Sequence, residues 1–141
     1  MKHNVILTVT LIMVLGIFSC NAQTNKKAEP KSTTSAKVEL YYFHFSVRCA
    51  TCHAVEDNSK AAFESLYPDK IRKGEYVFKG LNLDDAGSKA IAEKLGIGGQ
   101  TLLIVCGDKK VDLTSLGFMY AHDQDKIKEE IKKAVEKVLK G

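Results

Sequence analysis

Segments typical of strands alternate with segments typical of helices from residue 38 onward, and this alternation constrains the fold more than any other feature of the sequence. Strand-like runs rich in β-branched and aromatic residues are separated by runs whose apolar residues keep helical spacing. The expected strands are residues 38–45, 76–83, 101–106 and 110–116. The expected helices are 50–66, a short helix that is capped by Asp84 or Asp85 and closed by Gly96, and 123–140.

The order β-α-β-α-β-β-α has a direct topological consequence. Strands joined by a crossover helix lie parallel in one sheet, whereas Gly107-Asp108 joins the last two strands as an antiparallel hairpin. The sequence therefore predicts an α/β fold with a central mixed sheet of four strands and flanking helices.

Length and charge limit the classes of function. A chain of 141 residues supports one domain with appendages, and 45% hydrophobic with 27% charged residues is typical of a globular protein. Four lysines and one glutamate before residue 37 carry three of the four net positive charges, which leaves +1 for residues 37–141. A broad basic face for nucleic acid is not expected, and neither is an acidic face for cationic partners.

The first 19 residues resemble a lipoprotein signal peptide. Lys2 and His3 precede an apolar run over residues 5–18, which is shorter than the ~20 residues that span a bilayer. The run ends in Ile17-Phe18-Ser19-Cys20, which resembles a bacterial lipobox and implies cleavage before Cys20 and acylation of that cysteine. The alternatives are an ordinary cleaved signal or an uncleaved anchor.

Residues 20–36 predict a lipidated cysteine followed by a flexible tether. Residues 21–36 include no aromatic or branched aliphatic side chain, so the segment has nothing to bury. Fully extended, it reaches at most ~60 Å. We expect a monomeric domain over residues 37–141, anchored in the cell envelope and facing the periplasm, with inner or outer membrane left open.

The segment Cys49-Ala50-Thr51-Cys52 lies where the first expected strand meets the first expected helix. Unpaired backbone N–H groups and the positive end of the helix dipole favour a thiolate there. Arg48 adds a cation, and so does His53 when it is protonated. We therefore expect a lowered pKa for Cys49, which attacks a partner, while the less exposed Cys52 resolves the mixed disulfide.

Other readings of this pair remain open. The two cysteines could form a structural disulfide or half of a metal site. As a binding module, they could hold a soft metal or arsenite, with Cys106 or His53 as a further ligand. Taken by itself, Cys106 is expected to be a small buried apolar residue at the end of a strand. His44 is expected to be a hydrogen-bonded core or surface histidine rather than a catalytic one.

A third interpretation is that the cysteine pair attaches a haem group. Cys49 to His53 also matches the C-x-x-C-H pattern of c-type haem attachment, with Met119 as a possible distal ligand. Domains that carry c-type haem are mainly helical, whereas a strong strand precedes this motif. We therefore expect no cofactor and no metal in the redox interpretation.

Over residues 37–141 the chain resembles the thioredoxin superfamily. The matching pieces are the aromatic strand before the cysteine pair, residues 83–97, residues 101–105 and the amphipathic C-terminal helix. The resemblance implies a thiol–disulfide oxidoreductase with a protein thiol or disulfide as its partner.

Three departures from the thioredoxin pattern stand out. The position of that family's cis-proline, which guides the substrate backbone and keeps metals from the cysteines, falls on Gln100. The family's buried acid before the motif corresponds to Phe43, so proton transfer would use water or His53. Tryptophan is absent, and Arg48 precedes the first cysteine.

The segment Arg48-Cys-Ala-Thr-Cys52 and its aromatic, His-containing strand are similar to a narrower group. These are small thioredoxin-like lipoproteins of Bacteroidetes, the nitrophenyl compound nitroreductase subunit ArsF family. That resemblance implies an accessory role in nitroreduction or arsenic resistance, although the sequence contains no recognisable flavin or nitroarene site.

Overall fold

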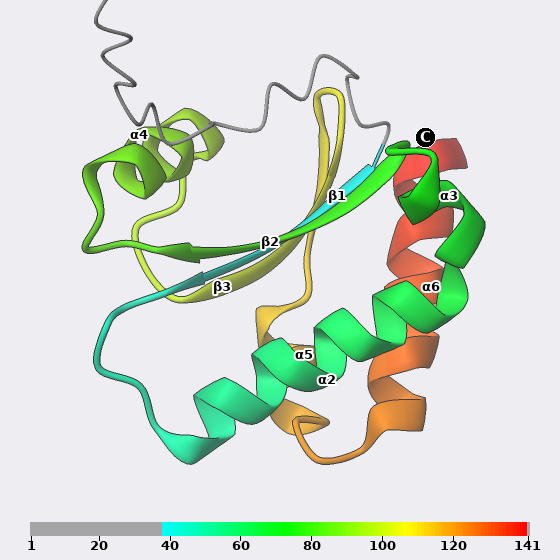
Figure 1. Ribbon diagram of the computed structural model, residues 1–141, viewed down its shortest axis with the longest axis horizontal. Coiled ribbons are helices and arrows are strands. Elements are labelled where there is room, and N and C mark those ends of the chain that lie inside the picture. Colours follow the sequence, from blue (N-terminus) through cyan, green and yellow to red (C-terminus); the bar gives the residue numbers. More distant parts are fainter. Residues whose placement is uncertain (1–37, 141) are drawn as a thin grey trace, which may run out of the picture. The chain divides into compact units, whose positions relative to one another are not determined.

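A computed structural model describes residues 38–140 of the chain (Figure 1). The signal peptide expected at 1–19, Cys20 and the tether lie outside the described residues. The strands are β1 (Val38–His44), β2 (Tyr76–Asn82), β3 (Thr101–Cys106) and β4 (Lys109–Asp112). The helices are α2 (Ala50–Leu66), α3 (Pro68–Arg72), α4 (Ala86–Leu95), α5 (Thr114–Met119) and α6 (Gln124–Lys140). None of these helices is long and apolar enough to cross a membrane.

The strands form one mixed sheet in the order β2-β1-β3-β4. β1 lies parallel to β2 and antiparallel to β3, and β3 lies antiparallel to β4. The predicted α/β class, four-stranded mixed sheet and flanking helices are thus confirmed. Central β1 is buried along most of its length because helices cover both faces of the sheet.

Alternate residues of β1 point to opposite faces of the sheet. Leu40 and Tyr42 pack in the core cluster that contains residues of α2 and α6. Tyr41 and Phe43 pack in a second cluster with residues of α4. Figure 1 shows α4 on one side of the sheet and α2 and α6 on the other.

Local signals mark the helix ends. The first turn of α3 contains Pro68, so Tyr67-Pro68 both ends α2 and begins a short further helix that the sequence analysis did not anticipate. Asp85 is the N-cap residue of α4, as expected, although its side chain makes no capping hydrogen bond, and Gly96 ends the helix with φ 72°. Glycine adopts this left-handed backbone without the steric cost that a Cβ brings.

The strand expected over residues 110–116 was too long. β4 ends at Asp112, whose carboxylate accepts a hydrogen bond of 2.8 Å from the backbone N–H of Thr114. This local turn ends the strand and begins α5. The hydroxyl of Thr114 then accepts a bond from the backbone N–H of Leu102, and Leu113 and Leu116 pack into the core. The apolar spacing of that segment therefore belongs to a helix.

Candidate functional site

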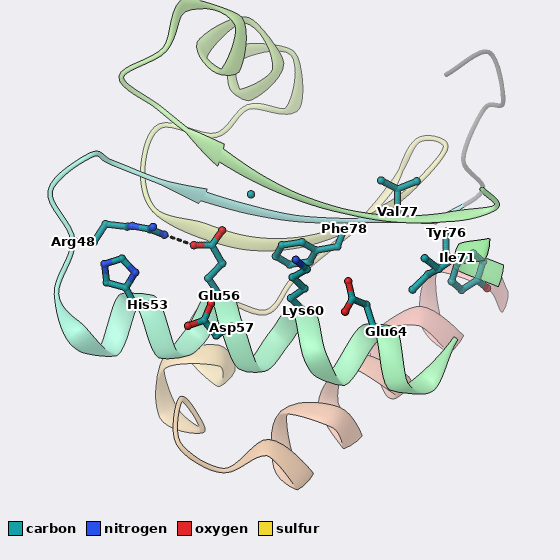
Figure 2. Close-up of a pocket in the computed structure, with 11 residues that line it drawn as sticks. Arg48, His53, Glu56, Asp57, Lys60, Glu64, Ile71, Tyr76, Val77 and Phe78 are labelled. Atoms are coloured by element: carbon teal, nitrogen blue, oxygen red, sulfur yellow. Dashed lines mark hydrogen bonds and ion pairs between the residues drawn. The ribbon is translucent and has the colours of Figure 1, made fainter. Parts of the chain in front are cut away.

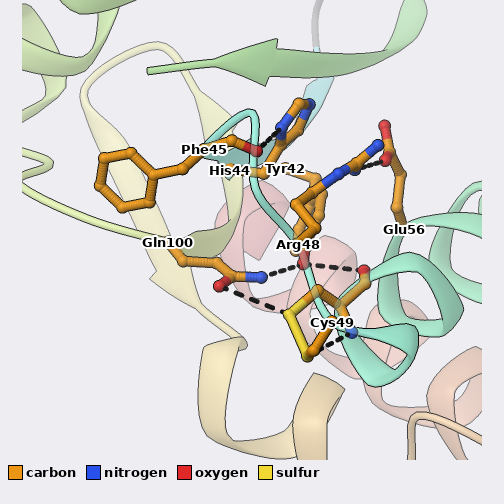
Figure 3. Close-up of polar contacts among 8 residues, drawn as sticks. Tyr42, His44, Phe45, Arg48, Cys49, Glu56 and Gln100 are labelled. Carbon is orange, nitrogen blue, oxygen red and sulfur yellow. Dashed lines mark hydrogen bonds and ion pairs between the residues drawn. A yellow bond between two sulfur atoms is a disulfide. The ribbon is translucent and has the colours of Figure 1, made fainter. Parts of the chain in front are cut away.

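Cys49 and Cys52 form a disulfide at the start of α2, with their Cα atoms 5.2 Å apart. Cys49 is the N-cap residue of α2 and has an extended backbone, so it stands just outside the first turn. Its side chain is exposed, whereas Cys52 is 7% exposed. The pair thus presents one sulfur to solvent while the other is buried. Figure 3 shows the disulfide that joins the two sulfurs.

The beginning of α2 favours negative charge on the outer sulfur. The backbone N–H of Cys52 donates to Cys49 Sγ over 3.3 Å. The first turn of α2 holds no acidic residue that would oppose the helix dipole. That these two features stabilise a thiolate at Cys49 more than at the buried Cys52, once the disulfide is reduced, stays a prediction.

Tyr42 lies beneath the cysteine pair and ties it to the sheet. Its hydroxyl donates a 2.9 Å hydrogen bond to the backbone carbonyl of Cys52 and accepts one from Gln100 Nε2. Gln100 Oε1 lies 3.8 Å from Cys52 Sγ. Burial raises the pKa of Tyr42, so its hydroxyl stays protonated and remains a donor at neutral pH. Gln100 thus reaches the inner sulfur from just before β3.

Arg48 is turned away from the sulfurs. Its guanidinium pairs with the Glu56 carboxylate, and the two side chains are only 17% and 20% exposed. Figure 3 shows the side chain of Arg48 extending toward Glu56 rather than toward Cys49. The paired carboxylate offsets much of the Arg48 charge, so the contribution of Arg48 to the pKa of Cys49 stays a prediction.

His53 lies beside a groove between α2 and β2 (Figure 2). Its backbone N–H donates to the carbonyl of Cys49 over 3.2 Å, while its exposed side chain helps to line the groove. The groove has a volume of about 630 Å³, and its walls combine charged side chains such as Lys60 with apolar ones such as Phe78. A role of His53 in proton transfer at the pair stays a prediction.

Gly80 gives the Glu56 carboxylate room against β2. A Cβ placed on Gly80 would collide with Glu56 Oε1. Because Gly80 has no side chain, the Glu56 carboxylate has the space over β2 in which it pairs with Arg48. Through Arg48, this contact holds the loop that leads into Cys49.

Sequence reasoning missed Tyr42, Glu56 and Gly80. Strand alternation was a usable signal for Tyr42, because Phe43, the position matched to the thioredoxin acid, faces the α4 cluster instead. Glu56 lies four residues after Cys52, on the same side of α2. No local pattern marks Gly80, whose importance depends on a contact between α2 and β2.

Cys106 is a free, half-buried cysteine at the far end of β3 from Gln100. Cys106 is the sixth residue along the chain from Gln100, and six strand steps span roughly 20 Å. It therefore cannot join Cys49 and Cys52 as a third ligand in one chain. Within residues 38–140, no three His, Cys, Asp or Glu side chains lie together as a metal site.

The geometry also bears on the haem interpretation. Attachment of haem needs both sulfurs to reach vinyl groups, but Cys52 is buried behind Cys49 and beside Gln100. Met119 lies at the end of α5 with a 67% exposed side chain. His44 lies at the end of β1, where its Nδ1 is 2.9 Å from the carbonyl of Phe45. The mixed sheet and the buried inner sulfur both favour redox chemistry over haem attachment.

Comparisons with known proteins add little to this geometry. No family model matches the chain, and no curated protein matches it. Among solved structures, the chain is similar to one described as a malarial protein, with 14% identity and a TM-score of 0.47. The match covers 70% of this chain and 97% of that one. A disulfide-forming CxxC pair in a thioredoxin-like α/β fold is therefore what the structure itself establishes.

Proposed function

We propose that this protein is a thiol–disulfide oxidoreductase that works outside the cytoplasm. One observation carries the proposal: Cys49 is exposed at the N-terminus of α2, and Cys52 is buried directly behind it. This arrangement separates an attacking sulfur from a resolving sulfur. A purely structural disulfide needs neither the exposure of Cys49 nor an N–H donor aimed at its sulfur.

The exchange proceeds in two balanced steps. In the reduced protein, the Cys49 thiolate attacks a partner disulfide, forms a mixed disulfide and releases one partner thiolate, which takes up a proton. Cys52 then loses its proton and attacks Cys49 Sγ, which forms the Cys49–Cys52 disulfide and releases the second partner thiol. Two electrons pass from the cysteine pair to the partner, and the reverse sequence oxidises a partner dithiol.

The residues around the pair have separate tasks in this scheme. The backbone N–H of Cys52 stabilises the outgoing and incoming thiolate of Cys49. Tyr42 holds the first turn of α2 through the carbonyl of Cys52, and Gln100 contacts the inner sulfur. Protons enter and leave through water or through the exposed His53.

Trapping tests this proposal. In a Cys52→Ala variant the mixed disulfide cannot resolve, so Cys49 should remain bound to its partner through a bond that dithiothreitol breaks. Cys106→Ala is the matched control, because that cysteine is half-buried and lies at the other end of the sheet. A wild-type pair that shows no reversible oxidation at any physiological potential would overturn the proposal.

The cellular setting is part of the same proposal. The lipobox-like segment ending at Cys20 supports a lipid-anchored protein of the cell envelope, where disulfides persist. Palmitate labelling that survives Cys20→Ala would contradict the anchor.

A narrower role follows from the resemblance to the ArsF family. The segment Arg48-Cys-Ala-Thr-Cys52 supports an accessory subunit that keeps a nitroreductase or an arsenic-resistance protein in its working redox state. Reduced wild-type protein, but not Cys49→Ser, should raise the activity of such a purified partner enzyme. Equal effects of the two proteins would remove this narrower role.

A further inference from the structure

The chain enters the sheet at the end opposite the disulfide. β1 begins at Val38 and ends at His44, from which the chain leads to Cys49. The seven residues of β1 span roughly 20 Å. The β3–β4 hairpin lies next to that entry point, because Glu39 is in register with Val105 and Cys106 with Lys109. Residues that precede Val38 are therefore attached beside the hairpin.

The last turns of α6 lie at the same place. A groove of about 340 Å³ is lined by Lys109, Lys110, Val111, Lys137 and Val138. The groove therefore places the end of α6 beside the β3–β4 hairpin. Hairpin, α6 terminus and chain entry thus share one end of the domain.

Three lysines line this groove, and Lys140 follows them at the end of α6. Together we call Lys109, Lys110, Lys137 and Lys140 the lysine surface. All four are exposed. Lys109 and Lys137 have no ion-pair partner among residues 38–140, while Lys110 donates to the carbonyl of Leu95. The nearby acids in sequence are Asp108, Asp112 and Glu136, of which Glu136 pairs with Lys140 at 3.4 Å. The surface keeps an excess of positive charge.

We propose that the lysine surface binds the headgroups of anionic phospholipids. Its charge is complementary to such a membrane, and each lysine near an anionic leaflet favours binding by about fivefold. The partly exposed Val111 and the 39% exposed Leu139 supply apolar area beside the lysines, while Val138 belongs to the buried core. The inference rests on the proposed membrane anchor, because the anchored segment joins the domain beside this surface.

Such docking orients the redox site. With the lysine surface on the membrane, Cys49 at the opposite end of β1 faces the aqueous phase. Asp84 and Asp85 follow β2 at the disulfide end, where Asp84 accepts a 2.8 Å bond from the N–H of Ser46. Their negative charge opposes contact with an anionic membrane, so the partner is a protein or domain outside the bilayer.

Lysine acetylation of the full-length protein in vesicles tests the proposal. The protein is reconstituted into phosphatidylcholine vesicles and into an equimolar mixture with phosphatidylglycerol, and acetylation of each lysine is followed by mass spectrometry. We expect Lys109 and Lys137 to be acetylated severalfold more slowly in the anionic vesicles. Molar salt should abolish the protection because it shortens the screening length to about 3 Å. Lys89 and Lys126, near the beginnings of α4 and α6, should react equally in both vesicles.

Charge-reversal variants provide a matched comparison. In Lys109→Glu/Lys137→Glu, the protection of Lys140 in anionic vesicles should be lost. In Lys89→Glu/Lys126→Glu, which changes the net charge equally, it should persist. Equal acetylation of Lys109 and Lys137 in the two kinds of vesicle overturns the proposal. Neither result depends on thiol exchange, so failure here and failure of the proposed oxidoreductase activity are distinguishable.

Discussion

The hydroxyl of Tyr42 donates a 2.9 Å hydrogen bond to the backbone carbonyl of Cys52. The bond joins the central strand to the first turn of the helix that carries both cysteines. Because Gln100 donates to the same hydroxyl and also lies beside Cys52 Sγ, three elements meet at the inner sulfur. The position of the resolving cysteine thus depends on the packing of the sheet.

Tyr42→Phe should lower the free energy of unfolding by about 1 kcal/mol, the usual net value of one buried hydrogen bond. It should also change the rate at which a mixed disulfide on Cys49 resolves, since Cys52 loses a support. Denaturant unfolding and stopped-flow resolution measure the two effects. Tyr41→Phe is the control for the resolution rate. The hydroxyl of Tyr41 donates to Glu39 on the other face of β1, so its loss should not change the rate of resolution. Equal resolution rates in all three proteins would remove Tyr42 from the site.

Glu56→Gln should destabilise the fold by about 2 kcal/mol, because it leaves the mostly buried guanidinium of Arg48 without a charged partner. The matched change Asp69→Asn breaks the exposed pair with Arg72 and should cost less than about 0.5 kcal/mol. Thermal and denaturant unfolding compare the two variants. Similar losses from both changes would show that burial of the Arg48–Glu56 pair does not matter.

Gly80→Ala should destabilise the protein and displace Glu56, because the new Cβ would occupy the space of the Glu56 carboxylate. Gly87→Ala is the control: Gly87 lies in α4, and a Cβ there has no atom within 4 Å. That second change should stabilise the protein by about 0.5–1 kcal/mol through helix propensity. Opposite signs in urea unfolding are the expected outcome, and a neutral Gly80→Ala would contradict the contact.

Tyr67 should make the protein lose stability in alkali. Burial raises the pKa of Tyr67 from 10.0 to about 12, and Tyr76 and Glu136 add to the shift. Below pH 10 the hydroxyl of Tyr67 is protonated in both the folded and the unfolded state, so Tyr67 gives the free energy of unfolding no pH dependence there. Between pH 10 and about 12 the unfolded state loses its proton first, so stability falls as pH rises. Tyr67→Phe should reduce that slope in unfolding curves while leaving the slope below pH 10 unchanged.

Cys49 of the reduced protein should react with iodoacetamide at a lower pH than an ordinary thiol, whose pKa is about 8.5. The N–H of Cys52 and the start of α2 supply the stabilisation. Mass spectrometry should find Cys49 labelled before the buried Cys52. A pH midpoint of labelling equal to that of a model thiol would contradict an activated sulfur.

Local patterns in the sequence were sufficient for the elements with strong periodicity. The aromatic strand before Cys49, the helix from Ala50 and the amphipathic C-terminal helix lie where they were predicted. The segment after Asp112 was assigned wrongly because its apolar spacing suits both a strand and a helix. The turn formed by Asp112 and Thr114 decides between them.

The sequence by itself determined the α/β class, the order of strands and helices, and the location of Cys49 and Cys52 at a strand-to-helix junction, because these follow from hydrophobic periodicity and short-range spacing. Only the tertiary structure decided that Tyr42 and Gln100 contact Cys52. It also decided that Glu56 forms an ion pair with Arg48, and that Cys106 lies far from the cysteine pair. Each of these relationships joins side chains on different elements. Such contacts depend on how helices pack on the sheet, which no local pattern encodes.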